Sequence, residues 1–201
     1  MNQEYITIQN EALEQACTYI MQSSLPCVER FLLVLLLRNG LRVSEICNPS
    51  NIKVHSKYNV WVFCTKNKTW RQVNAAEAAD LLDDEQVIMD LMIWKRNRQY
   101  YYRHLKGLLV GVETSRTGNE AVTHAARNIQ AQQAFNATGS MQATRTSIGN
   151  ASDRATEKYI TQGQRMAKQT GGVFDSVSGT TANLNMTRKG VVRHRKKQSK
   201  S

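Results

Sequence analysis

The chain has 201 residues, four cysteines and a formal net charge of +11. This length allows one domain with a proper core but not two large ones. The charge predicts an anionic partner and favours nucleic acid over an anionic membrane surface. The longest apolar stretch, residues 31–37, is far too short to cross a membrane, and the polar, acidic residues 1–15 resemble neither a signal nor a transit peptide.

The cysteine pattern indicates neither a zinc site nor a disulfide framework. Cys17, Cys27, Cys47 and Cys64 are widely spaced and form no CxxC pair. They are expected to be buried thiols in a reducing compartment, which predicts a cytoplasmic protein, or one in the host cytoplasm or nucleoid if the source is viral. No metal site and no cofactor are expected.

The predicted elements define an α+β protein that is mainly helical. Only two prolines and many Ala, Leu and Gln residues favour helices. Between the early helices and the later ones, aromatic and β-branched runs predict a small antiparallel sheet, with a hairpin tip at Lys66. In chain order, helices are expected over 9–23, 27–39 and 43–47, strands over 52–55, 59–65 and 69–73, and helices over 75–82, 84–96, 99–112, 120–137, 140–148 and 153–167.

The C-terminal segment differs in composition from the rest of the chain. Residues 160–201 contain nine Lys or Arg and one acid, and from about Gly171 the chain has few large apolar residues. Such a segment cannot bury enough apolar surface to fold, so domain boundaries of 1–168 and 169–201 are expected, the second being a disordered basic tail. We expect the tail to bind phosphates, or alternatively to be a solubility tail or an address signal. Its candidate DNA contacts are Arg193, Arg195, Lys196 and Lys197.

A second basic segment, WKRNRQYYYRHLK at 94–106, interleaves aromatic and basic residues. Its candidate DNA-binding residues are Lys95, Arg96, Arg98 and Arg103. The alternative is an amphipathic helix pair in which the tyrosines pack and the cations are only solvated.

Five residues stand out as a possible phosphoryl-transfer set: Arg42, Lys66, His124, Arg127 and Tyr159. His124 and Arg127 are one helical turn apart, so their side chains project from the same face. Arginine binds phosphate bidentately and stays charged. No acidic metal-binding cluster accompanies them, so the cations themselves would stabilise the transition state. Each residue taken alone has an ordinary structural explanation.

The order and spacing of this set resemble those of tyrosine recombinases of the phage-integrase type over residues 10–165. LLLRNGLRVSEI resembles their first arginine segment, and Lys66 follows Arg42 by 24 positions on the hairpin. An HxxR helix follows, and IGNASDRATEKY resembles the segment that ends at the nucleophilic tyrosine. The resemblance implies the helical catalytic domain of that family, with its small sheet.

The resemblance also implies a mechanism. Tyr159 would attack DNA to form a 3′-phosphotyrosyl intermediate, so that no ATP is needed. Arg42 and Arg127 would bind the non-bridging oxygens, and Lys66 would protonate the leaving 5′-oxygen. His124 would bind the phosphate and assist proton movement, and Glu45 would orient the arginine and the histidine. Because a tyrosine phenol is a weak nucleophile at neutral pH, the surrounding cations would favour its ionisation.

Two departures from the family pattern affect these expectations. Asn150 takes the place of the usual His or Trp; it can donate a hydrogen bond to phosphate but cannot carry a proton, so reduced activity is expected. In addition, about 30 residues precede the Arg42 helix, whereas most relatives have an N-terminal clamping domain. The basic segments would then supply the grip on DNA. Residues 160–170 would dock weakly, if at all, onto a neighbouring protomer.

The expected partner is double-stranded DNA, with a monomer in solution that assembles into dimers or tetramers on DNA, and no membrane. The favoured function is site-specific recombination or integration, in a virus or mobile element. Alternatives are a type IB topoisomerase-like nicking-closing enzyme and a recombinase-derived DNA-binding protein without strand exchange. A ribosomal or nucleoid-type basic protein accounts for the charge but not for the spaced set of residues.

Overall fold

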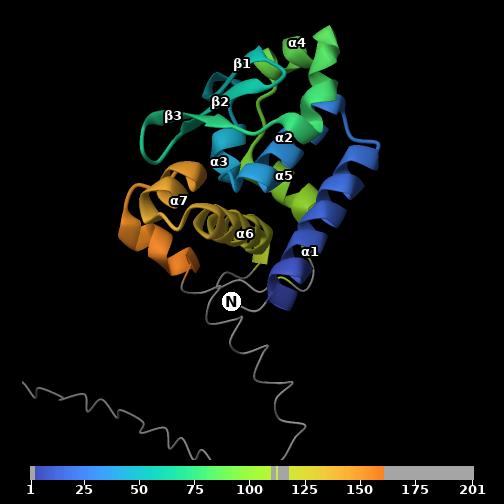
Figure 1. Ribbon diagram of the computed structural model, residues 1–201. Helices are drawn as coiled ribbons and strands as arrows, with labels where there is room; N and C mark the ends of the chain where they lie inside the picture. Colours follow the sequence, from blue (N-terminus) through green and yellow to red (C-terminus); the bar gives the residue numbers. More distant parts are fainter. Residues whose placement is uncertain (1–2, 110–111, 113–117, 161–201) are drawn as a thin grey trace, which may run out of the picture.

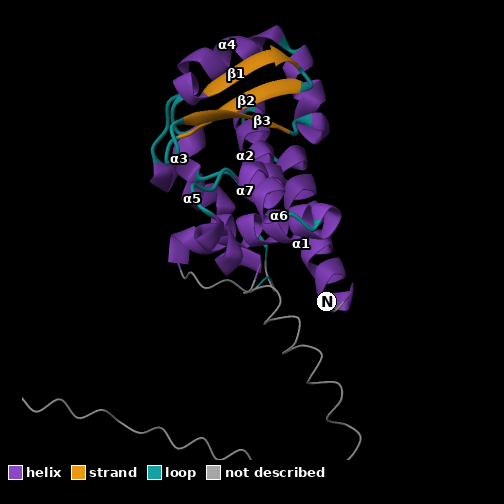
Figure 2. Ribbon diagram, turned by 60° about the vertical axis from the view of Figure 1, so that its left-hand side comes forward, coloured by secondary structure: helices purple, strands orange, loops and turns teal. Residues whose placement is uncertain are grey.

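The computed structural model describes residues 3–109, 112 and 118–160. The predicted basic tail with its candidate contacts Arg193, Arg195, Lys196 and Lys197, the predicted docking segment beyond residue 160 and the predicted boundary at residue 168 lie outside this part of the chain. Helices form most of the described structure, and a three-stranded sheet lies at one end of the helical body (Figure 2). The predicted α+β class with a small antiparallel sheet is confirmed.

The central element is α2 (Cys27–Asn39), which is buried along almost its whole length. Residues 31–37 are each at most 1% exposed because α2 is surrounded by other elements. It packs against α1 (Gln3–Gln22), α6 (Ala121–Thr138), α4 (Glu85–Ile93) and the 3-10 helix η2 (Ala76–Asp83) (Figure 1). The apolar run in the sequence is therefore the centre of the core.

The end of α2 determines where the Arg42 segment starts. Gly40 has a left-handed backbone (φ +51°), and the Leu41 amide donates to the Leu36 carbonyl at 2.9 Å, which closes the helix. A Cβ atom at Gly40 would lie 3.0 Å from the Cα of Arg127, so α6 also approaches closely here. The chain then turns directly into the short helix α3 (Val43–Ile46).

The sheet has the order β1-β2-β3 and is antiparallel throughout, with β1 (Ile52–Ser56), β2 (Asn59–Cys64) and β3 (Thr69–Val73). The 3-10 helix η1 (Pro49–Asn51) leads into it. Along β2, Val60, Val62 and Cys64 face the core and are buried, as expected from the period of two. Pairing of Cys64 with Thr69 leaves residues 65–68 as the turn, with Lys66 exposed in it.

The remaining elements are α5 (Arg98–Leu105), the 3-10 helix η3 (Gly118–Glu120), α7 (Met141–Ile148) and a helix over residues 153–160. The β2–β3 turn and α7 lie on the same side of the molecule (Figure 1). This arrangement brings residues from the middle and the end of the chain to the segment that follows α2.

The structure differs from the sequence expectations mainly at helix ends. Residues 76–83 form a 3-10 helix rather than an α-helix. The helix expected over 84–96 ends at Ile93, because Asn97 caps a new helix by accepting from the Tyr100 amide at 2.9 Å. The helix expected over 99–112 ends at Leu105, where Gly107 adopts φ +84°.

Among the described residues, no helix has both the length and the apolar character needed to cross a membrane. The four cysteines form no disulfide. Cys17 and Cys64 are buried as expected, whereas Cys27 and Cys47 are only half-buried. Burial raises the pKa of the Cys64 thiol.

Candidate active site

The C-terminal end of α7 is the centre of the candidate site. A helix end leaves backbone carbonyls without intrahelical donors, and these carry partial negative charge. Arg127, on α6, is 2% exposed and donates to the Ile148 carbonyl at 2.8 Å and to the Gly40 carbonyl. Arg127 therefore ties the end of α7 to the end of α2.

Arg42 reaches the same place from the start of α3. Its Nη1 donates to the Gly149 carbonyl at 3.2 Å and to Glu45 Oε1 at 3.0 Å. The other oxygen of Glu45 accepts from the Arg42 backbone amide at 3.0 Å, so this carboxylate binds both the backbone and the guanidinium group of Arg42. Glu45 is fully buried, whereas the Arg42 side chain is 23% exposed and lines a cavity. Of the two residues that Glu45 was expected to orient, Arg42 is in contact with it, and the role toward His124 stays a prediction.

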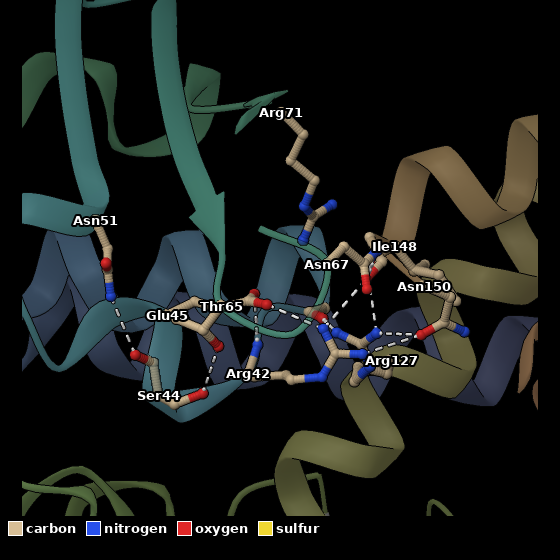
Figure 3. Close-up of polar contacts among 12 residues, drawn as sticks. Arg42, Ser44, Glu45, Asn51, Thr65, Asn67, Arg71, Arg127, Ile148 and Asn150 are labelled. Atoms are coloured by element: carbon tan, nitrogen blue, oxygen red, sulfur yellow. Dashed lines mark hydrogen bonds and ion pairs between the residues drawn. The ribbon is translucent and has the colours of Figure 1, made fainter. Parts of the chain in front are cut away.

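Asn150 joins the two arginines. Its Oδ1 accepts from Arg127 Nη2 at 2.9 Å and from Arg42 Nη2 at 3.2 Å (Figure 3). Its amide nitrogen donates to Thr156 Oγ1 at 3.2 Å, and the residue is 7% exposed. The Asn150 amide nitrogen was predicted to donate to a phosphate. In the structure it donates to Thr156, and the side-chain oxygen of Asn150 bridges the two guanidinium groups.

Tyr159 lies beside this arginine pair. Its ring stacks on His124 with centroids 6.3 Å apart, and the Arg127 guanidinium carbon lies 5.7 Å from the ring centroid. Arg42, His124, Arg127 and Tyr159 line one cavity of about 160 Å³. Four of the five residues singled out in the sequence thus meet in a single small cavity.

A second tyrosine, Tyr102, lines the same cavity. Burial raises the pKa of Tyr102, and the nearby Glu120 raises it further, so its phenolate is disfavoured. Glu120 also lies 4.0 Å from Nε2 of His124, one turn away on the same stretch of chain. The cavity therefore contains two phenol groups, those of Tyr102 and Tyr159.

Positive charge is concentrated at this point. Burial lowers the pKa of Arg127, and the neighbouring Arg42 lowers it further, while contacts with Tyr159 act in the opposite direction. Burial also lowers the pKa of Arg71 on β3. Even with the buried Glu45 carboxylate beside Arg42, the guanidinium groups of Arg42, Arg71 and Arg127 leave a net positive charge, so the arrangement is suited to bind a further anion.

Lys66 lies in a different cavity from Tyr159. It lines an open cavity of about 570 Å³ together with Asn67, Arg71, Arg145 and Asn150. Asn150 borders this cavity and also binds the arginines that line the other one. The structure therefore brings Lys66 to the same region but not into direct contact with the arginine pair.

Sequence reasoning missed Arg71 and Asn67. Arg71 is 8% exposed and donates to the Ser147 carbonyl and, at 3.2 Å, to the Asn39 carbonyl. Its position on the core-facing side of β3, two residues before Val73, was a usable signal, because an inward-facing arginine requires partners. Asn67 donates to the Gly149 carbonyl at 3.2 Å, for which a polar turn residue gives no signal.

The predicted DNA-binding residues of 94–106 have different surroundings. Arg98 lines the Tyr159 cavity, whereas Arg103 lines another cavity beside α1. Lys95 is exposed, and Arg96 stacks on the Trp94 ring at 3.9 Å. Tyr101 is fully buried, as the packing alternative for this segment expects.

No metal centre is formed by the described part of the chain. Within residues 3–109, 112 and 118–160, no three His, Cys, Asp or Glu side chains gather closely enough to hold a metal ion. The candidate site consists of guanidinium groups, one imidazole, one phenol and one buried carboxylate.

The fold is that of a tyrosine recombinase catalytic domain. Among solved structures, the chain is similar to the XerH site-specific recombinase bound to palindromic difH substrate in a post-cleavage complex. The TM-score is 0.58 and the identity 16%, over 83% of this chain and 52% of that one. The pre-cleavage complex of XerH with difH gives a TM-score of 0.54 and 16% identity, over 75% and 48%.

The chain therefore spans about half the length of these recombinase chains. No protein-family model matches the sequence, and no curated protein matches it either. The similarity lies in the fold.

Proposed function

We propose that the protein cleaves and rejoins double-stranded DNA through a 3′-phosphotyrosyl intermediate on Tyr159, as a site-specific recombinase or integrase. The observation that carries the proposal is the single cavity lined by Arg42, His124, Arg127 and Tyr159. These side chains come from positions 42 to 159 of the chain, and a fold with recombinase neighbours brings them together.

The chemistry follows from the contacts. Arg42 and Arg127 are held with their guanidinium groups side by side by Asn150, which suits two non-bridging oxygens of one phosphate. In the transition state these oxygens gain charge, and groups already in place stabilise it without reorganisation. In this proposal His124, whose ring stacks on that of Tyr159, takes part in moving the phenol proton.

Each remaining group has a role in the proposal. Glu45 orients Arg42 through two hydrogen bonds, and Asn150 spaces the arginines rather than binding phosphate. Lys66 donates the proton to the leaving 5′-oxygen from the hairpin side. The exposed cations Lys95, Arg98 and Arg103, together with the basic tail, add contacts to the DNA backbone. We further propose a cytoplasmic protein that is monomeric alone and assembles on DNA.

The test uses nicked suicide DNA substrates without metal or ATP. Loss of the short strand after cleavage traps the covalent complex, which is visible on a denaturing gel. Wild-type protein is expected to form an adduct, and Tyr159→Phe is expected to form none while still shifting DNA on a native gel.

The outcomes separate the proposal from its alternatives. An adduct followed by strand exchange between two sites supports a recombinase, whereas relaxation of supercoiled DNA without exchange supports a nicking-closing enzyme. A DNA shift without any adduct contradicts cleavage and leaves a DNA-binding protein.

A further inference from the structure

We propose that Asn67 is a positioning residue, which holds the Lys66 hairpin against the arginine pair through the carbonyl of Gly149. This inference rests on the proposed function and adds a residue to its machinery. It follows from three observations: how the hairpin turn is closed, how the base of the hairpin is anchored, and which bond fixes its tip.

The turn itself is closed by local bonds. The amides of Asn67 and Lys68 donate to the Cys64 carbonyl at 3.1 and 2.8 Å. These bonds determine the shape of the turn but not its place relative to α7. Lys66 is exposed, so its own side chain does not fix the tip by packing.

The base of the hairpin is anchored firmly to α7. Arg71 donates to the Ser147 carbonyl, and a Cβ atom at Gly149 would lie only 2.7 Å from Cys64 Sγ. Figure 3 shows Arg71 extending from β3 toward Asn67 and Ile148. The ends of β2 and β3 that flank the turn are thus in close contact with the end of α7, and the direction of the tip that carries Lys66 remains to be fixed by another contact.

At the tip, the Asn67 amide nitrogen donates to the Gly149 carbonyl at 3.2 Å. The same oxygen accepts from Arg42 at 3.2 Å, so one backbone atom is shared by the hairpin and the phosphate-binding arginine. The Asn67 side-chain oxygen is buried and has no hydrogen-bond partner among the described residues, which is unusual for a buried acceptor. It is an available acceptor for a lysine ammonium that turns toward bound phosphate.

The step affected is protonation of the leaving group. The Tyr159 oxygen forms a bond to phosphorus while the bond from phosphorus to the 5′-oxygen breaks. The phenol proton passes to His124 or water, and the Lys66 ammonium donates a proton to the departing 5′-oxygen. If Asn67 acts by placing Lys66, its loss slows this protonation and leaves phosphate binding and nucleophilic attack intact.

The test compares two suicide substrates that differ in one atom, with oxygen or sulfur as the bridging 5′ atom at the scissile phosphate. A thiolate leaves without protonation because thiols are far more acidic than alcohols. Lys66→Ala is expected to slow cleavage of the oxygen substrate by about 10²-fold, the lower part of the range for general acid catalysis, and to cleave the sulfur substrate at nearly the wild-type rate. Asn67→Ala is expected to show the same pattern at about tenfold on oxygen.

Two further variants serve as controls. Asn67→Asp keeps the size, the turn preference and the acceptor oxygen of the residue but cannot donate to Gly149, so selective slowing of the oxygen substrate by this variant assigns the positioning to the donor bond. Asn59→Ala removes a side-chain bond, to Trp61, at the opposite turn of the same sheet, and is expected to cleave both substrates like wild type. Thermal melting of all variants reports on folding.

The results separate the inference from the proposed function. Equal slowing of both substrates by Asn67→Ala, or no slowing of either, overturns the positioning role while cleavage by wild type stands. Absence of an adduct from wild type on both substrates overturns the proposed function and this inference with it.

Discussion

Arg38 and the arginines at the end of α7 are anchored in different ways. Arg38, at the end of α2, binds the carboxylates of Glu14 and Glu77. Arg71 and Arg127 bind backbone carbonyls, and Arg42 has one carboxylate partner, Glu45, besides its carbonyl and amide partners. All of them have hydrogen-bonded guanidinium groups, yet the net charge around them differs in sign.

The difference explains which arginines are available to an anion. Carboxylates satisfy and also neutralise a guanidinium group, so two of them leave the Arg38 cluster with excess negative charge. Carbonyls satisfy its hydrogen bonds without neutralising it, so three guanidinium groups around one carboxylate remain positive. Because burial strengthens electrostatic interactions, we expect the second arrangement to attract phosphate and the first not to.

The largest effect is expected for Arg127. Arg127→Ala removes the donor to Ile148, Gly40 and Asn150 and is expected to slow adduct formation by about 10²–10³-fold. Arg127→Lys keeps the charge but cannot bridge these acceptors, so it is expected to restore little activity. Single-turnover cleavage measures both, and a Lys variant with wild-type rate would show that charge alone matters.

Variants at Arg42 and Glu45 distinguish an effect on protein stability from an effect on DNA cleavage. Arg42→Gln leaves the fully buried Glu45 without its ion-pair partner, which is expected to lower the free energy of unfolding by about 3 kcal/mol. Adding Glu45→Gln removes the uncompensated charge and is expected to restore much of the stability but not cleavage. Urea unfolding and the adduct assay measure the two properties, and recovery of activity in the double variant would contradict a phosphate-binding role for Arg42.

Gly149 tests how closely the hairpin packs on α7. Gly149→Ala is expected to destabilise the protein through its left-handed backbone (φ +63°) and through contact with Cys64 and Arg71. Gly139→Ala is the matched control because it has the same φ of +63° with nothing within 4 Å of the added Cβ. We expect a loss of about 1 kcal/mol for Gly139→Ala and about 2–3 kcal/mol for Gly149→Ala. Equal losses in urea unfolding would show that the packing is loose.

The smallest effect is expected at Arg38. Arg38→Gln removes contacts with two partly exposed carboxylates and is expected to change the free energy of unfolding by less than about 1 kcal/mol. DNA affinity and its dependence on salt should stay unchanged. A fall in affinity comparable to that of Arg42→Gln would remove the distinction between the two kinds of arginine.

The features of the fold that the sequence predicted are those that depend on the local pattern of apolar and polar residues. The burial of α2 and the alternating burial along β2 follow from hydrophobic spacing, and both are as expected. Helix ends were placed less accurately because they depend on single capping contacts, such as that of Asn97 with the Tyr100 amide.

The site was predictable in its residue types but not in its contacts. Spacing identified Arg42, His124, Arg127 and Tyr159, which meet in one cavity. It could not show that Asn150 binds the two arginines, because that depends on the direction of its amide group. Arg71 and Asn67 bind the backbone carbonyls of residues 147 and 149. Every residue has a backbone carbonyl, so the residue types in the sequence could not indicate these contacts.

The most direct test of the account is to identify the residue that carries the trapped DNA. Digestion of the covalent complex with protease and nuclease, followed by mass spectrometry, gives the peptide and the end of the DNA that is attached. We predict a nucleotide linked through its 3′-phosphate to the peptide that contains Tyr159. Attachment to Tyr102, which lines the same cavity, or through a 5′-phosphate would contradict the account.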